Sequence, residues 1–319
     1  MKKILSMILV IVIVTYLFTG CAAKTNYITK YNGKIKIGVC IYDYNDAFMS
    51  YMIKEMKDYS QSLNNVEIEY ADSQRDSNRE LEQAENFISK GVDVLVVNPV
   101  DTDSTDPISD KANAAGVPII SVNNKFNNEN DPVCFIDSNK KQSAILEMEY
   151  LAKKVNYKGN VAIIMGIMGQ DGQRLRTQGF HEVIAKYPDM KIVAEQAADW
   201  NRSKGRALME IWLQSAKDIN VVACENDELA IGALTAIEKA GKLGKINVGG
   251  INASPDALDY LQSGKLAVTV FPNLIGQSHA VLDNAVKAAK GEKVEKTIIF
   301  EDELVTPKDA DKYIAKWKN

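Results

Sequence analysis

The chain has 319 residues, of which 46% are hydrophobic, and a formal net charge of −4 at pH 7. This length is typical of about two domains. The slight acidic excess excludes a broad basic surface for nucleic acid, and two histidines offer little material for a multi-histidine metal site or for histidine-based catalysis.

The N-terminal segment is predicted to be a lipoprotein signal peptide over residues 1–20. A basic start precedes an apolar run over residues 5–18, which is too short for a comfortable membrane span. The run ends at Leu17-Phe18-Thr19-Gly20-Cys21, which resembles a bacterial lipobox, with Phe18 where that motif usually has Leu. The resemblance implies cleavage before Cys21 and a lipid on its sulfur. A plain secretory signal or a membrane anchor is the alternative.

Residues 21–32 then form a polar tether, and the folded part begins near Gly33, outside the cytoplasmic membrane. From there apolar β-branched runs alternate with amphipathic helical patterns. The strands predicted in the first half cover residues 34–42, 66–71, 92–98, 117–123 and 132–136. A strand–helix–strand order requires right-handed crossovers and predicts a parallel sheet covered on both faces.

The alternation then restarts, with strands predicted at residues 160–165, 191–197, 220–223 and 246–251, followed by a tail with strands at 266–271 and 297–300. The fold class is therefore α/β, with two similar doubly wound parallel-sheet lobes. We expect crossings near Ile136, Phe271 and Glu301, which act as a three-segment hinge. The first lobe comprises residues 33–136 and 272–301, and the second comprises residues 137–271 and 302–319.

Three cysteines, Cys40, Cys134 and Cys224, lie in or beside predicted buried strands and are interpreted as small core residues. One disulfide is an open alternative. No CxxC spacing occurs, so we expect neither a zinc site nor a redox pair.

Motifs for a catalytic serine, a zinc protease or a phosphate-binding loop are absent from the sequence. A hydrolase using Asp46 with another carboxylate is the enzyme alternative, but the sequence offers it no positioned nucleophile. We therefore expect a binding protein that is not an enzyme and needs no cofactor.

Polar and aromatic side chains gather at the predicted strand ends, where ligands of parallel sheets bind. Carboxylates, amides and arginine can hydrogen-bond the hydroxyls of a sugar or polyol, and an aromatic ring can cover its C–H face. The candidates are Asp46, Asn123, Arg176, Asn226 and Asn252 for hydrogen bonds, and Phe48 and Trp200 for stacking.

Several of these candidates have a structural alternative. Asp46 is a residue type favoured at a helix N-cap. Phe48 and Trp200 suit core packing. Arg176 suits a solvated or ion-paired position on a helix, and Arg174 competes for its role.

With these residues, the chain resembles the periplasmic-binding-protein family of the ribose, galactose and inositol type over residues 34–313. The resemblance rests on DAFM at residues 46–49, VNPVD at 97–101, ENDELAIGA at 225–233 and GGINASPDAL at 249–258. It implies a type I fold, in which two lobes close by a hinge on a sugar that is delivered to an ABC importer. It also implies stacking by Phe48 and Trp200 and polar contacts by the residues Asp46, Asn123, Arg176 and Asn226.

The chain departs from the family pattern at four places. Asn252 stands where the family usually has Asp, and Asn124 where a basic residue often follows the position of Asn123. The hinge amide of many relatives falls on Pro272, for which Asn273 or Gln277 can substitute. Residues 156–160 lack the oxygen ligands of the galactose-type calcium loop, so we predict no metal.

NPVDTD at residues 98–103 and WNRSKG at 200–205 look most like inositol- and rhizopine-type binders, which favours a cyclitol such as myo-inositol or a pyranose close to it. We expect a monomeric extracytoplasmic lipoprotein, anchored at Cys21, that captures this ligand for an ABC importer and binds no nucleic acid. A ligand sensor that docks on a membrane chemoreceptor or sensor kinase is the alternative. A transcription repressor with the same lobes would need a helix-turn-helix before Lys34, where the signal segment stands.

Overall fold

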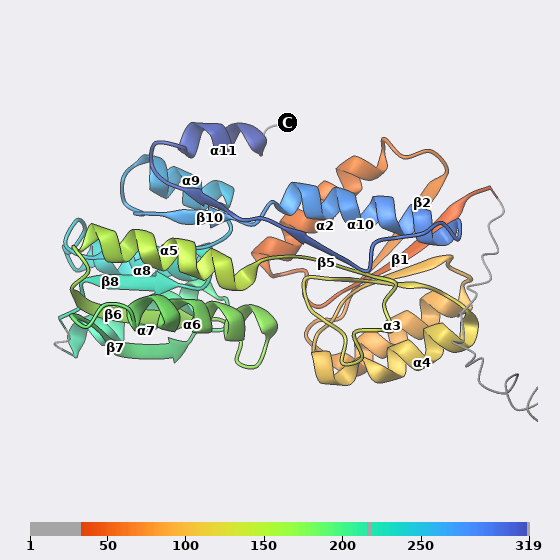
Figure 1. Ribbon diagram of the computed structural model, residues 1–319, viewed down its shortest axis with the longest axis horizontal. Helices are drawn as coiled ribbons and strands as arrows, with labels where there is room; N and C mark the ends of the chain where they lie inside the picture. Colours follow the sequence, from red (N-terminus) through yellow and green to blue (C-terminus); the bar gives the residue numbers. More distant parts are fainter. Residues whose placement is uncertain (1–32, 216–217, 318–319) are drawn as a thin grey trace, which may run out of the picture.

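The structure, a computed structural model, describes residues 33–215 and 218–317. The predicted signal peptide, Cys21 and the tether lie outside these residues. Within the described part, no helix is long and apolar enough to cross a membrane. The chain forms two α/β lobes side by side along the long axis of the molecule (Figure 1).

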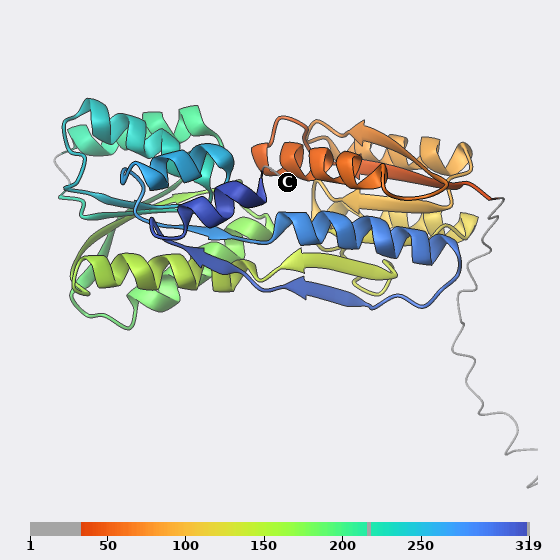
Figure 2. The same cartoon turned by 90° about the horizontal axis from the view of Figure 1, so that it is seen from above.

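The first lobe is built on six parallel strands in the order β11-β5-β4-β3-β1-β2. Their bounds are β1 (Ile35–Ile41), β2 (Val66–Asp72), β3 (Val94–Asn98), β4 (Ile119–Val122), β5 (Cys134–Ser138) and β11 (Thr297–Phe300). Helices α2 (Ala47–Ser60) and α10 (Leu274–Ala289) cover one face, and α3 (Ser77–Ser89) and α4 (Asp106–Ala115) cover the other (Figure 2). Because both faces are covered, β3 is buried at every position, which explains its continuous apolar run.

The second lobe has four parallel strands in the order β7-β6-β8-β9. They are β6 (Gly159–Met165), β7 (Met190–Ala197), β8 (Val221–Cys224) and β9 (Asn247–Gly249). Helices α5 (Lys140–Lys154) and α6 (Asp171–Ile184) pack on one face. The other face is covered by α7 (Arg202–Gln214), α8 (Asp227–Lys239) and α9 (Pro255–Gln262), with α11 (Ala310–Lys316) packed on α9.

The chain passes three times between the lobes. It leaves the first sheet after β5 to enter α5, returns from β10 (Thr269–Phe271) into α10, and leaves again from β11 into β12 (Glu303–Val305). Strands β10 and β12 pair antiparallel beside the second lobe. That these segments bend together, with the lobes moving as the units bounded above, remains a prediction.

The predicted α/β class with two parallel-sheet lobes is confirmed. The short strand β12 and the 3-10 turn η1 (Thr102–Ser104) had no counterpart in the prediction. Three residues of extended or turn conformation produce too little periodicity to stand out in a sequence. Cys40, Cys134 and Cys224 are buried free thiols in β1, β5 and β8.

Gly232 lies where α8 crosses α7. A Cβ atom at this position would stand 2.2 Å from the carbonyl oxygen of Arg202 and 2.9 Å from the amide nitrogen of Arg206. These are backbone atoms, so helix α7 would have to shift. We expect Gly232→Ala to lower the free energy of unfolding by about 1 kcal/mol or more, net of the gain in helix propensity. Denaturant midpoints check this against Lys239→Ala on the exposed side of α8, and an unchanged midpoint would contradict the close helix contact.

Candidate functional site

The loops at the carboxyl ends of both sheets face one another between the lobes. Three cavities there are lined from both sides. The largest, about 370 Å³, lies between Asp101 and Asn124 of the first lobe and Gln170 and Asp171 of the second. The other two, of about 120 and 10 Å³, are lined by Asp46, Arg75, Trp200 and Asn201 and by Phe48, Tyr51, Asn252 and Trp317. Five of the nine predicted site residues line these cavities, namely Asp46, Phe48, Asn124, Trp200 and Asn252.

Trp200 forms a flat wall of the cleft on the second lobe. It follows β7 in a tight loop, with a φ angle of 61°, and its Nε1 donates a hydrogen bond of 2.8 Å to Oε1 of Gln170. Its ring lies directly against Gly166, where a Cβ atom would stand 2.0 Å from the ring. Only a glycine at that position leaves room for the indole.

Arg176 lies beside this ring, with its Cζ 5.6 Å from the centre of the Trp200 ring. It is buried in α6, and its Nη1 donates a hydrogen bond of 2.5 Å to the carbonyl oxygen of Glu225. Its Nε has no hydrogen-bond partner among the described residues. Burial lowers the pKa of Arg176, and the carboxylates of Glu225 and Asp302 oppose that shift. Arg174 instead points outward and pairs with Asp171.

Asn226 and Asn252 end the next two loops of the second lobe. Asn226 caps α8 by accepting from the amide of Leu229, and its Nδ2 donates to the carbonyl oxygen of Trp200 over 3.4 Å. Asn252 is buried at a φ of 133°, beside Phe48 of the opposite lobe. Its Oδ1 has no partner within the described part of the chain. Asn226 is therefore largely used by the fold, whereas Asn252 has an acceptor to spare.

On the first lobe, Asp46 is the N-cap of α2, which was the alternative weighed for it. Its Oδ1 accepts from the amide of Met49 over 3.0 Å, and burial raises the pKa of its carboxyl. The Tyr42 hydroxyl is hydrogen-bonded to the same carboxyl, and Asp46 lines the same cavity as Trp200. Phe48 is half-buried in the first turn of α2. It packs on the core and also lines the cleft, so it serves both of the roles that were considered for it.

Of the three further candidates, Asn124 and Asn273 use their side chains in structural hydrogen bonds, whereas Asn123 does not. The Nδ2 of Asn124 donates to the carbonyl oxygen of Pro99 over 2.9 Å, and Asn273 caps α10 by accepting from the amide of Gly276. Asn123 adopts a φ of 63°, and its carbonyl oxygen accepts a hydrogen bond from Lys140. Its side-chain amide makes no hydrogen bond in residues 33–215 and 218–317, which leaves it for a ligand.

A buried ion pair that was not predicted lies at the first crossing. Lys140 is only 3% exposed and bonds both Asp137 and the carbonyl oxygen of Asn123. Its Cε would be 3.8 Å from a Cβ at Gly172, which borders the Trp200 ring. Asp137 directly follows the strand predicted at residues 132–136, but the sequence does not show that it is buried with Lys140. Gln170, the partner of Trp200, was also missed.

Buried carboxyl groups surround Arg176. Burial raises the pKa of Glu225 to about 8 and that of Glu147 well above its usual range. Glu147 accepts from the amide of Cys224, while Glu225 accepts from Gly166 and Thr177. The charge of Arg176 acts against the effect of burial and lowers the pKa of both carboxyl groups. No group of three or more His, Cys, Asp or Glu side chains in the described residues is arranged to hold a metal ion.

Asp302 lies in the third crossing and accepts a hydrogen bond from Ser143. Burial raises the pKa of Asp302 to about 7, so the folded protein binds this proton more tightly than the unfolded chain. Its stabilising contribution is therefore present at low pH and is lost as the pH rises through about 7. Asp302→Asn, which resembles the neutral acid, should gain more thermal stability over the wild type at pH 8 than at pH 5. A gain that does not change with pH, or an equal gain from exposed Glu301→Gln, would contradict this.

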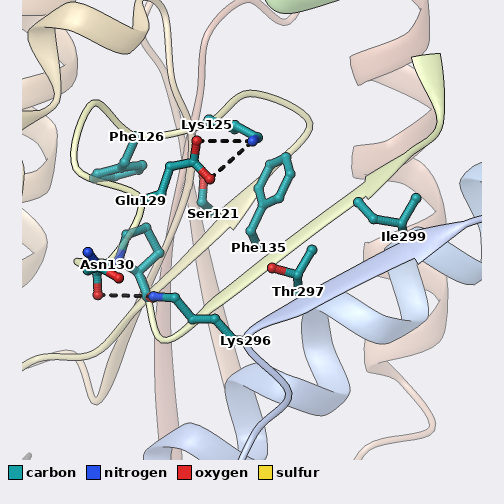
Figure 3. A pocket seen from close by; sticks show the side chains of 10 residues that line it. Ser121, Lys125, Phe126, Glu129, Asn130, Phe135, Lys296, Thr297 and Ile299 are labelled. Carbon is teal, nitrogen blue, oxygen red and sulfur yellow. Dashed lines mark hydrogen bonds and ion pairs between the residues drawn. The ribbon is translucent and has the colours of Figure 1, made fainter. Parts of the chain in front are cut away.

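A further cavity, in the first lobe, is not part of this cleft. It has a volume of about 400 Å³ and lies over β4, β5 and β11, beneath the loop that carries Lys125 and Glu129 (Figure 3). Lys125 pairs with Glu129 over 3.0 Å, and Lys296 donates to the carbonyl oxygens of Asn130 and Pro132. Because both cations are already satisfied, this cavity offers little to a polar ligand.

Comparison with known proteins assigns the fold and the cleft to one class. The periplasmic binding protein domain matches residues 37–293. The chain therefore belongs to the periplasmic binding protein family, as its motifs predicted. This is a family of solute-binding proteins.

Three individual proteins are similar to this chain over most of its length. A Rhizobium meliloti protein assigned as rhizopine-binding is 36% identical over 276 residues, which is 85% of this chain and 89% of the relative. The ribose import binding protein of Bacillus subtilis is 30% identical and covers 97% of this chain and 100% of its own length. A crystal structure of an ABC transporter solute binding protein from Bacillus halodurans with bound myo-inositol is 41% identical, with a TM-score of 0.86, over 90% of this chain and 100% of that chain.

Proposed function

We propose that the protein captures a small polyol between its lobes, with a cyclitol such as myo-inositol as the preferred ligand. The main support is a pair of buried polar atoms without a partner in the described residues: Nε of Arg176, beside the Trp200 ring, and Oδ1 of Asn252, which lines a cavity between the lobes. Buried polar groups almost always have a partner. Ligand hydroxyls can both donate and accept, so they can satisfy the two atoms together.

The proposed contacts come from both lobes. Asp46, Phe48 and Asn123 contribute from the first lobe, and Arg176, Trp200 and Asn252 from the second. Asn226, Asn124 and Asn273 position the loops that carry these residues. Because each lobe supplies only half of the contacts, ligand favours the closed arrangement over the open one.

The ligands named for the relatives are all sugars or polyols, which supports a polyol ligand here, but they differ from one relative to the next. The 41%-identical relative was crystallised with myo-inositol, while a 30%-identical relative is a xylitol-binding protein and another imports ribose. Isothermal titration calorimetry of the purified chain with myo-inositol, xylitol, ribose and galactose tests the proposal. Heat with myo-inositol at one-to-one stoichiometry is expected. Binding of ribose or galactose but not of myo-inositol would overturn the cyclitol preference. The absence of binding heat with all four compounds would overturn the proposed function.

We further propose that the protein is a lipoprotein anchored at Cys21 that delivers its ligand to an ABC importer at the outer face of the membrane. The lipobox-like run before Cys21 supports the anchor. In the wild type, the intact mass of the purified protein should show the loss of residues 1–20 and the addition of a lipid. With Cys21→Ser in the full chain, both changes should be absent. Thr19→Ser, which keeps a small hydroxyl residue before the cleavage site, is the matched control and should be cleaved and lipidated. A wild-type mass without these changes, or equal processing of wild type and Cys21→Ser, would contradict the anchor.

A further inference from the structure

The last described residue, Trp317, contacts both lobes. It directly follows α11, whose C-terminal end lies over the space between the lobes (Figures 1 and 2). Its ring lies 5.0 Å from the ring of Tyr51 on α2, at an angle of 52°. Its Nε1 donates a hydrogen bond of 2.8 Å to the carbonyl oxygen of Ala253 in the second lobe.

Helix α11 itself is fastened to the second lobe alone. Tyr313 is buried against Phe271, with ring centres 5.3 Å apart, and its hydroxyl donates to Glu303 over 2.6 Å. Lys316 reaches the same carboxylate over 3.0 Å. On α9, Gln262 donates to Asp311. Trp317 is therefore carried by the second lobe, and its contact with Tyr51 exists only when the first lobe is close.

The position of Trp317 also bears on the ligand. Together with Phe48 and Asn252 it lines the small cavity between the lobes. Ala253, whose carbonyl it holds, adopts a φ of 47°, and the neighbouring Asn252 a φ of 133°. These angles are unusual for residues with side chains. The bond from Trp317 is thus placed to hold the loop that presents Asn252.

We propose that Trp317 is a positioning residue that latches the closed lobes through Tyr51 and fixes the Asn252 loop through Ala253. A contact made in the closed form and lost in the open one shifts the equilibrium toward closure. Its effect on the ligand is then mainly on the rate of release. The proposal rests on the proposed polyol binding for that kinetic effect, whereas the effect on closure does not require a ligand.

The experiment compares the wild type with Trp317→Ala, Trp317→Phe, Tyr51→Ala and the double variant Tyr51→Ala/Trp317→Ala. Small-angle X-ray scattering of the ligand-free chain measures the radius of gyration, and stopped-flow with myo-inositol measures the release rate. Trp317→Ala should be more open without ligand and release myo-inositol roughly fivefold faster, as expected for loss of one aromatic pair. The double variant should open no further than Trp317→Ala, because the two rings act on each other.

Trp317→Phe separates the two roles, since it keeps a ring against Tyr51 and loses the bond to Ala253. It should keep the wild-type radius of gyration and still release ligand faster. Ile314→Ala, on the same helix and packed on the second lobe, is the control and should change neither. A wild-type radius of gyration in Trp317→Ala would overturn the latch. If myo-inositol fails to bind the wild type, the polyol proposal fails, but the scattering comparison still decides the latch.

Discussion

Replacing Arg176 by alanine should weaken polyol binding by about 2 kcal/mol or more, which is roughly a thirtyfold rise in Kd. The guanidinium is buried beside Trp200 with one free donor, and the alanine variant would leave ligand hydroxyls without their charged partner. Arg176→Lys should recover only part of the loss, because an ammonium cannot reproduce the planar fork of donors. Calorimetry with myo-inositol provides the measurement.

Arg174 offers a matched control for this prediction. It lies on the same helix, two residues away, with its side chain 66% exposed and paired to Asp171. Arg174→Ala should bind as the wild type does. Because Arg176 also balances Glu225 and Asp302, the thermal unfolding of Arg176→Ala must be recorded beside its affinity. A folded Arg176→Ala variant with wild-type affinity, or a large loss in Arg174→Ala, would place the site elsewhere.

Gly166→Ala should lower affinity at least about tenfold by displacing the Trp200 ring, since stacking and its placement are lost together. The added methyl would stand 2.0 Å from the indole, so the ring must turn away and release its hydrogen bond to Gln170. The backbone of Gly166 has no need of a left-handed conformation, so the effect is one of space alone.

A double-variant cycle tests whether Gly166→Ala lowers affinity through the Trp200 ring. Trp200→Ala should itself lose affinity through stacking and remain folded. In that background Gly166→Ala should cost no further affinity, because the ring that it displaces is gone. Near-additive losses would show that Gly166 acts on the ligand by another route.

The alternation of strands and helices was predictable because each buried strand and each amphipathic helix carries its own local pattern. Ligands of parallel sheets bind at the carboxyl ends of the strands, so residues that follow the predicted strands could be selected as candidates. Asp46, Phe48, Trp200 and Asn252 were found in this way, and each lines a cavity between the lobes. It was harder to predict which of the polar residues cap helices and which are free to contact a ligand. Asp46, Asn226 and Asn273 all cap helices, and a cap and a ligand contact favour the same residue types.

The remaining features depend on contacts between distant parts of the chain. Lys140 and Asp137 look like ordinary charged residues at a helix start, and only the crossing of the lobes buries them. Asp302 meets Ser143 across 159 positions of sequence. Trp317 meets Tyr51 and Ala253 from the far end of the chain. No local periodicity encodes such pairs, so they follow from the assembled fold.

The position of the tryptophans has a spectroscopic consequence. The chain contains three, and all of them belong to the second lobe: Trp212 is buried in its core, whereas Trp200 and Trp317 face the opposite lobe. The tryptophan fluorescence of the protein therefore originates entirely on one side of the hinge. Emission from Trp212 supplies a constant background, while the other two indoles change surroundings as the first lobe approaches, so closure can be followed in unlabelled protein.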